Sequence, residues 1–518
     1  MKNFCLVVAF FTLGGEVISQ VNFSEHISPL IYNHCTKCHR EGEIGPFPMT
    51  NYAEVAANGS GIEYVTAIKY MPPWRPDHNY SHFMGENILT DAEIQMISDW
   101  VSGGMPLGNP DLEAPMPVFP TGSQVGIPDL VLTMEEPYQH FGTNTDQYQI
   151  FVLPTGLTTT RDVEAIEVRA DNKSICHHAI LGVDTTGTAA ALDAADPEYG
   201  YTEFGGFGFE PVDQFFTAWV PGSSPLVYPP TIGKKLFANS DLLMQMHYGP
   251  TPIDEYDQTS VNIFFSDDPI IRYVNTYPIS PYNLDEPFII LPNQVKTFHG
   301  TLDVAFDISL IGIAPHAHLL AKSYEVYAVS PNGNDTINLI KVPEWNFNWQ
   351  GLYAYPNMKH IPAGYTVHCF GTYDNTSSNP FNPNDPPQLT TWGESTSDEM
   401  YLCYLQFVLY LPGDENISLA VPDKNDRIVY PVNQLFPSYP NPTSDRFTIG
   451  YSLNQSNNVD LAIHDIQGRW IKQVLSGAHR GPGKHKETFD VGELPPGIYL
   501  YRLRVGNFEQ SRQLVITR

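Results

Sequence analysis

The sequence predicts a mainly β protein, with one small α-helical domain, two jelly-roll β-sandwiches and a C-terminal immunoglobulin-like β-sandwich. The chain has 518 residues, too many for a single core, so several domains are expected. Its 45 prolines, 39 glycines and 12% aromatic residues favour short strands and turns over long helices. Short apolar runs bounded by turn residues support this, for example at 129–134, 148–153, 163–169, 261–265, 324–329 and 401–411.

The N-terminus predicts export. A basic start followed by a short apolar stretch indicates a secretory signal peptide over residues 1–20, and no later segment reaches transmembrane length. The 27 Lys and Arg against 57 Asp and Glu give a formal charge of −30, which argues against nucleic acid and anionic membrane surfaces as partners. Five cysteines remain after Cys5 leaves with the signal.

Residues 21–108 carry a haem-attachment motif. Cys35-Thr36-Lys37-Cys38-His39 fits the pattern in which two thiols bond the porphyrin and the adjacent His ligates iron. The alternatives are half of a zinc site or a redox dithiol, but the chain has no second Cys pair to complete a four-cysteine zinc site. We therefore predict one covalently attached c-type haem.

The second haem ligand is expected before the helix that closes this module. Met71 is our choice, because the prolines of Met71-Pro72-Pro73 make a stiff loop; Met84 and Met49 are the alternatives. The closing helix is predicted at 90–101, with Thr90 as N-cap and Glu93 completing a capping box. The module resembles the small cytochrome c domains that are fused to secreted oxidases and oxygenases.

A linker rich in Pro and Gly is predicted at 109–128, and three histidine motifs follow it. His316 and His318 follow the strand predicted at 308–313, and residues i and i+2 of an extended chain point the same way. His177 and His178 are adjacent, so both can reach one metal only if a bulge or irregular backbone turns one of them. His247 ends another apolar strand.

These side chains predict a metal and favour copper. Three imidazoles suit copper or zinc. Met400 heads a predicted strand, where a Met is most often a core residue. A thioether combined with two imidazoles is nevertheless a soft ligand set that selects copper, particularly Cu(I).

The ordered motifs His177-His178, His247, His316-x-His318 and Asp398-Glu399-Met400 resemble the copper type II, ascorbate-dependent monooxygenases. This is the family of peptidylglycine α-hydroxylating monooxygenase and dopamine β-hydroxylase. The resemblance implies two jelly rolls, 129–270 and 271–420, each holding one copper ion across a solvent cleft.

In the resemblance, the first three histidines bind an electron-transfer copper. His316, His318 and Met400 bind the copper that activates dioxygen, so that a C–H bond of a small-molecule or peptide substrate is hydroxylated. One oxygen atom enters the substrate and the other leaves as water. An external reductant, ascorbate or a redox partner, supplies the electrons.

The resemblance also implies a disulfide near Met400, for which Cys369 and Cys403 are the candidates. In the family the second Cys directly follows the Met, whereas here it lies three residues later. Cys176 is then unpaired, either as a small buried hydrophobe or as a soft contact to metal.

A linker at 421–433 precedes a last domain at 434–518. Its Pro440-Asn441-Pro442 start, its turn from Asp465 to Arg469 and its Pro496-Gly497-Ile498-Tyr499 strand resemble the C-terminal sorting domain of the type IX secretion system of Bacteroidetes. This implies export through the type IX machinery to the medium or the cell surface.

Together the parts predict a secreted copper monooxygenase that receives electrons through its own haem. Two alternatives stay open. The first is a secreted haem and copper electron-transfer protein without hydroxylase activity, which would have no need of Met400. The second is a zinc hydrolase, against which the sequence lacks an HExxH-type pair with its general base.

Overall fold

The computed structural model describes residues 20–117, 119, 123–203, 206–393 and 395–419 and, in the C-terminal part, 433–435, 438, 441–444, 446–453, 456–481, 483–492, 494–506 and 508–517. The predicted signal peptide up to residue 19 and the predicted linker up to residue 432 lie outside the described residues. The chain divides into two compact units, Met1–Leu419 and Ala420–Arg518.

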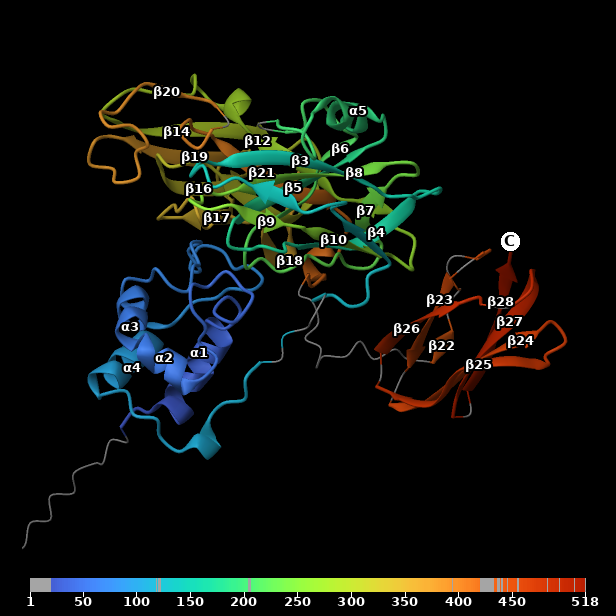
Figure 1. The fold of residues 1–518 in the computed structure, drawn as a ribbon. Coiled ribbons are helices and arrows are strands. Elements are labelled where there is room, and N and C mark those ends of the chain that lie inside the picture. Colours follow the sequence, from blue (N-terminus) through green and yellow to red (C-terminus); the bar gives the residue numbers. More distant parts are fainter. Residues whose placement is uncertain are drawn as a thin grey trace, which may run out of the picture. The chain divides into compact units, whose positions relative to one another are not determined.

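The first part of the larger unit is helical. Thr90 caps helix α4, and its side chain and that of Glu93 form the predicted capping box. Ile97 and Trp100 on this helix are buried in the core of the module together with Met49. The prediction of the closing helix is therefore confirmed. The helices, drawn in blue in Figure 1, are η1 (Phe23–Ile27), α1 (Ser28–His34), α2 (Tyr52–Ala57), α3 (Gly59–Ala67) and α4 (Asp91–Ser102), followed by the short η2 (Pro110–Leu112).

The first β-sandwich pairs a sheet of order β1-β10-β4-β7-β11 with a sheet of order β3-β8-β5-β6. Apolar residues of both sheets form one core. Arg272 and Tyr273 still pair with β7, so this sandwich extends slightly beyond the boundary predicted at residue 270. Its elements are β1 (Leu130–Thr133), β2 (Tyr138–His140), β3 (Gln147–Pro154), β4 (Arg161–Arg169), β5 (Cys176–Asp184), α5 (Thr188–Ala195), β6 (Asp213–Trp219), β7 (Ile232–Leu236), β8 (Asp241–Tyr248), β9 (Glu255–Asp257), β10 (Ser260–Phe265) and β11 (Arg272–Tyr273).

The second β-sandwich has the same plan. Sheets of order β12-β21-β15-β18 and β14-β19-β16-β17 enclose another apolar core. Its elements are β12 (Asn275–Ile279), η3 (Pro281–Asn283), β13 (Ile289–Ile290), β14 (Gln294–Asp303), β15 (Ile308–His316), β16 (Ala321–Val329), β17 (Thr336–Val342), β18 (Tyr353–Ile361), β19 (Thr366–Asn375), β20 (Thr390–Thr391), β21 (Leu402–Leu409) and η4 (Asp414–Asn416).

Residues 77–84 of the helical module bind to this second sandwich. The backbone N–H of Asp77 donates to the carbonyl of Lys341 at 2.8 Å, and that of Met84 donates to the carbonyl of Ala354 at 2.7 Å. Phe83 packs its ring against those of Tyr353 and Tyr355. Met84 packs against an apolar cluster formed by residues of both sandwiches, and its role as an alternative haem ligand is not tested by this contact.

The C-terminal unit is a sandwich of a three-stranded sheet, β22-β23-β26, and a four-stranded sheet, β25-β24-β27-β28, around its own core. In the predicted turn, Asp465 accepts a hydrogen bond from Arg469 Nε at 2.6 Å, and Gly468 has a positive φ of 79°. The strands are β22 (Gln434–Leu435), β23 (Arg446–Leu453), β24 (Asn457–Asp465), β25 (Trp470–Arg480), β26 (Gly483–Asp490), β27 (Gly497–Val505) and β28 (Phe508–Ile516).

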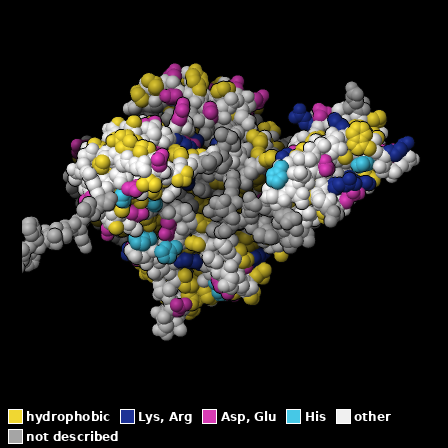
Figure 2. Space-filling model, turned by 90° about the horizontal axis from the view of Figure 1, so that it is seen from below, with side chains coloured by type: hydrophobic (Ala, Val, Ile, Leu, Met, Phe, Trp, Pro, Cys, Tyr) yellow, Lys and Arg dark blue, Asp and Glu magenta, His cyan; other side chains and the backbone are white. Residues whose placement is uncertain are grey.

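The predicted fold class is confirmed: the chain is mainly β, with antiparallel sheets and few helices. None of the helices in the described residues is long and apolar enough to cross a membrane. Figure 2 shows Asp and Glu side chains scattered over one face of the molecule. On this face the acidic side chains are not gathered into a single patch.

Candidate metal centre

The first sandwich brings three of the predicted ligands together. In the pairing of β5 with β8, Cys176 lies opposite Tyr248 and His178 lies opposite His247, so the register shifts at His177. A register shift of this kind is a β-bulge, which turns a side chain out of the regular alternation. The irregular backbone that two adjacent histidine ligands require is therefore present, and it places His177 beside His178 and His247.

The ring nitrogens of these three histidines converge. Nδ1 of His178 lies 3.2 Å from Nδ1 of His177 and 3.4 Å from Nδ1 of His247. One ligand atom from each of the three side chains lies within 4.8 Å of the others. His177 Nε2 is buried and has no hydrogen-bond partner. The nitrogens of three imidazoles face one another, and one further nitrogen is buried without a partner. This arrangement suits a metal site better than a group of histidines that only hydrogen-bond each other.

Two residues that the sequence analysis did not identify, Asp146 and Tyr148, fix the position of the His247 ring. Its Nε2 hydrogen-bonds the carboxylate of Asp146 at 2.8 Å, and its ring stacks on Tyr148 with centroids 4.1 Å apart. A carboxylate on one ring nitrogen selects the tautomer whose other nitrogen can ligate a metal. Burial acts to raise the pKa of Asp146, but the hydrogen bond with His247 and the other polar contacts of the carboxylate outweigh it and lower this pKa below its ordinary value. Asp146 lies in a polar turn, so no sequence signal distinguished it.

Replacing Asp146 by Ala should therefore weaken metal binding without removing a ligand. Loss of such an orienting carboxylate typically lowers metal affinity about 10- to 100-fold. Titration of copper against a competing chelator measures this change. Asp268→Ala, at an exposed position, is the control and should bind copper as the wild type does. Equal affinity in Asp146→Ala and the control would contradict the role given to Asp146.

The second pair lies at the end of β15. His316 is the last residue of the strand, and His318 lies in the loop at 317–320 that follows it, which we call the tip. Their ring centroids are 5.5 Å apart. Nδ1 of His318 donates to the carbonyl of Asp398 at 3.3 Å, which leaves its Nε2 to face a ligand. His316 is placed by the ladder to β21, where it lies opposite Leu402.

The side chain of Glu399 links the Met400 segment to this tip by hydrogen bonds. The fully buried carboxylate accepts backbone N–H groups from His318, from Leu320 at 2.8 Å and from Met400 at 2.8 Å. Burial raises the pKa of Glu399 to about 8, against the effect of these donors. The hydroxyl of Tyr373 donates to the carbonyl of Met400. Glu399 thus links the backbone of His318 to that of Met400, and the ligand role of the Met400 thioether stays a prediction.

The two histidine groups also meet each other. The ring centroids of His178 and His316 are 6.4 Å apart, and Phe347 stacks on His177 at 4.9 Å and lies edge-on to His318 at 5.8 Å. The resemblance leads us to expect a solvent cleft between two metal sites. The structure differs from that expectation, because the five imidazoles form one cluster between the sandwiches with a phenyl ring packed against it.

Burial lowers the pKa of His177, His178, His316 and His318 and so keeps these four imidazoles neutral. It lowers the pKa of His177 and of His316 to about 3 and that of His318 to about 4. Burial, followed by the neighbouring imidazoles, also holds the pKa of His178 well below its ordinary value. A neutral imidazole keeps a lone pair on one nitrogen, so each of these rings is in the form that binds a metal.

The haem motif lies in the turn after α1. His39 is largely buried, and its Nδ1 hydrogen-bonds the carbonyl of Phe47 at 3.0 Å, which leaves Nε2 to ligate iron. Gly45 lies over this ring, where an added Cβ would be 2.8 Å from His39 Cγ. Cys35 and Cys38 are free thiols. These features fit a covalently held haem. Met71 is half-buried just beyond α3, and its ligand role stays a prediction.

The remaining cysteines lie in the two sandwich cores. Cys369 and Cys403 are free thiols whose side chains hydrogen-bond each other between the sheets of the second sandwich. The predicted disulfide is not formed here and stays a prediction. Cys176 is buried in the first core and hydrogen-bonds Asp257, so it is a core residue and not part of the histidine group.

These features define a multidomain protein with a CxxCH module and a histidine cluster between two β-sandwiches. Residues 438–517 match the family described as the secretion system C-terminal sorting domain. The C-terminal unit is therefore a sorting domain that interacts with the type IX secretion machinery, and the protein is secreted or held at the cell surface. This part of the sequence prediction is confirmed.

A comparison with curated proteins finds no match. Similar solved structures include a β-glucuronidase of Parabacteroides merdae, with 10% identity over 46% of this chain and 29% of that one and a TM-score of 0.14. The VP2 subviral particle of infectious bursal disease virus has 11% identity over 57% of this chain and 76% of that one, with a TM-score of 0.17. The chain thus spans less than a third of the P. merdae β-glucuronidase, and TM-scores this low carry no argument about fold or function.

Proposed function

We propose that this protein is a secreted copper-dependent monooxygenase that hydroxylates an activated C–H bond with dioxygen and draws electrons through its own c-type haem. The observation that carries the proposal is the convergence of His177, His178 and His247 with His316 and His318, beside the segment of Met400. With copper bound, the centre would supply the electrons and the dioxygen activation that hydroxylation needs.

The chain's own residues prepare this chemistry. Asp146 and Tyr148 fix the His247 ring, and Glu399 ties the His318 tip to the Met400 segment. Phe347 covers His177 and His318, which limits the access of water to the cluster. Water exclusion matters because it protects reactive oxygen species from side reactions.

Two features favour copper over zinc in this proposal. A thioether from Met400 is a soft ligand that suits Cu(I), whereas zinc sites use thiolate, imidazole and carboxylate ligands. A one-electron haem carrier in the same chain is useful to a redox metal and not to zinc. The substrate class follows the resemblance, a small molecule or peptide with an activated C–H bond.

The test is to measure the haem and metal content of the mature protein by mass spectrometry and copper EPR, beside Met400→Ala. We expect one haem and two copper ions per chain in the wild type. Met400→Ala should keep the haem and lose substrate-dependent oxygen consumption. Met358→Ala, which removes a buried methionine from another apolar cluster, controls for loss of packing and should keep that activity.

Three outcomes would contradict the proposal. Stoichiometric zinc, or no stoichiometric metal, would exclude a copper oxygenase. Full oxygen consumption in Met400→Ala would remove the role of the thioether. Two coppers and one haem with no oxygen consumption on any C–H substrate tried would instead favour a haem and copper electron-transfer protein.

A further inference from the structure

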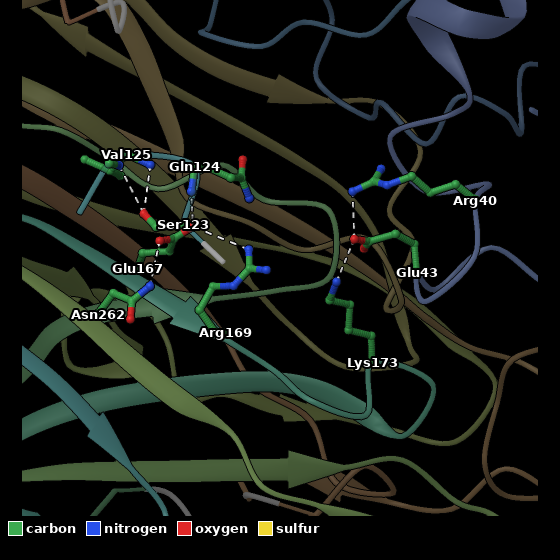
Figure 3. A network of polar contacts seen from close by, with 10 residues as sticks. Arg40, Glu43, Ser123, Gln124, Val125, Glu167, Arg169, Lys173 and Asn262 are labelled. Carbon is green, nitrogen blue, oxygen red and sulfur yellow. Dashed lines mark hydrogen bonds and ion pairs between the residues drawn. The ribbon is translucent and has the colours of Figure 1, made fainter. Parts of the chain in front are cut away.

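The haem-attachment turn is docked on the first sandwich. Lys173 Nζ lies 2.7 Å from the carboxylate of Glu43, which also pairs with Arg40 at 2.7 Å. Figure 3 shows both cations pointing at Glu43, Arg40 from the helical module and Lys173 from the sandwich. On the other side of the turn, Lys37 Nζ donates to the hydroxyl of Ser224 at 3.0 Å.

This contact is close and partly buried. The side chains of Lys173 and Glu43 are only 17% and 20% exposed. A Cβ added to Gly222 would lie 3.4 Å from Sγ of Cys38, so the thiol that binds the haem lies next to the backbone of the sandwich. Partly buried, networked ion pairs hold a geometry better than isolated surface pairs do.

The two sandwich loops that contact the haem turn, those of Lys173 and Gly222, also lie close to the histidine cluster. Lys173 precedes His177 by four residues in the same loop and strand. Gly222 lies in the loop after β6, and Val220 in that loop lies near Gly351, where an added Cβ would be 3.8 Å from Val220 Cγ2.

The second segment ends at His316. Gly351 follows Gln350, whose side chain lies next to His316. One segment therefore connects the haem turn to the first histidine group through the chain itself. The other connects it to the second group through packed loops.

We infer that this docked surface, formed by Lys37, Cys38 and Glu43 on the haem turn and Lys173, Gly222 and Ser224 on the sandwich, is the junction through which electrons enter the histidine centre. The inference rests on the proposed function. With a haem held by Cys35, Cys38 and His39 and copper held by the histidines, each transfer would carry one electron from haem iron, oxidised from Fe(II) to Fe(III), to copper, reduced from Cu(II) to Cu(I). No bond or proton moves. The ion pair acts by holding the haem turn against the loop of His177.

The contact is tested first on the haem-loaded, copper-free full-length mature protein. A zero-length carbodiimide reagent joins a carboxylate to an amine only where the two are in contact. We expect an amide between Glu43 and Lys173, identified by peptide mass spectrometry. Its absence from a protein in which other ion pairs, such as that of Glu325 with Lys341, do react would overturn the junction.

Electron transfer is tested next on the copper-loaded protein. The haem is reduced, the protein is mixed with oxygen, and haem reoxidation is followed by its absorption. Glu43→Lys and Lys173→Glu each place like charges together and should slow reoxidation by roughly tenfold, because removing one partner of a partly buried pair disfavours the docked state. The double variant Glu43→Lys with Lys173→Glu restores opposite charges and should recover most of the wild-type rate.

Glu41→Lys is the matched control, since it makes the same charge change at an exposed position two residues from Glu43, and it should leave the rate unchanged. If wild-type haem oxidation requires copper but both single reversals reoxidise at the wild-type rate, the junction is wrong and the proposed function stands. If wild-type haem is oxidised equally fast without copper, the proposed function fails, and the junction fails with it.

Discussion

Replacing His178 by Ala is expected to abolish tight copper binding at the first histidine group. Its ring lies 4.8 Å from that of His247 and 6.4 Å from that of His316, so it is the histidine through which the two groups meet. Loss of a ligand should lower copper affinity by more than the roughly 100-fold limit for loss of an orienting residue. Chelator competition and copper EPR measure the change.

The control for this prediction is His360→Ala. His360 lies on β18, where it pairs with Asp307 at 3.1 Å and stacks on Tyr410. That variant should bind copper as the wild type does. The role of His178 as a ligand would be disproved by wild-type affinity and an unchanged EPR signal in His178→Ala.

Replacing Glu399 by Ala is expected to destabilise the second sandwich strongly, even without metal. The buried carboxylate accepts three backbone N–H groups, from His318, Leu320 and Met400. Alanine would leave these donors buried without partners, and each unsatisfied buried donor costs about 1–3 kcal/mol. We expect a loss of about 3 kcal/mol, at the lower end of the range for three donors, since a water molecule in the vacated space can satisfy some of them.

Urea unfolding of the copper-free protein, followed by tryptophan fluorescence, measures this effect as a shift of the transition midpoint. Glu399→Gln retains the shape and one acceptor oxygen, so it should fall between the wild type and Glu399→Ala. Glu344→Ala, at an exposed position, should unfold within about 0.5 kcal/mol of the wild type. A Glu399→Ala midpoint equal to that of Glu344→Ala would mean that the carboxylate does not support the tip.

Much of the local structure could be predicted because it depends on neighbours in the sequence. Thr90 and Glu93 are three residues apart, so their capping box can be recognised without any tertiary contact. The same holds for the apolar runs that became β3, β4 and β10. The sorting domain was recognised for a related reason, since its turn from Asp465 to Arg469 is local.

The candidate site was predicted in part. The sequence placed His247 and His316 at the ends of apolar strands and showed that His177 and His178 need a bulge. Asp146 and Phe347 were missed, since an Asp in a turn and a Phe in a loop are common at positions without function. Their importance depends on which histidine they touch.

The sequence by itself determined the β-rich class, the Cys35–His39 motif, the strand-end histidines and the sorting domain, because each depends on residues only a few positions apart. The tertiary structure alone decided that five histidines from two sandwiches form one cluster, that Glu399 joins the His318 tip to Met400, and that Glu43 meets Lys173. The physical reason is that hydrophobic periodicity determines which face of a strand is buried. It carries no information about which loops of two separately formed cores come to lie against each other.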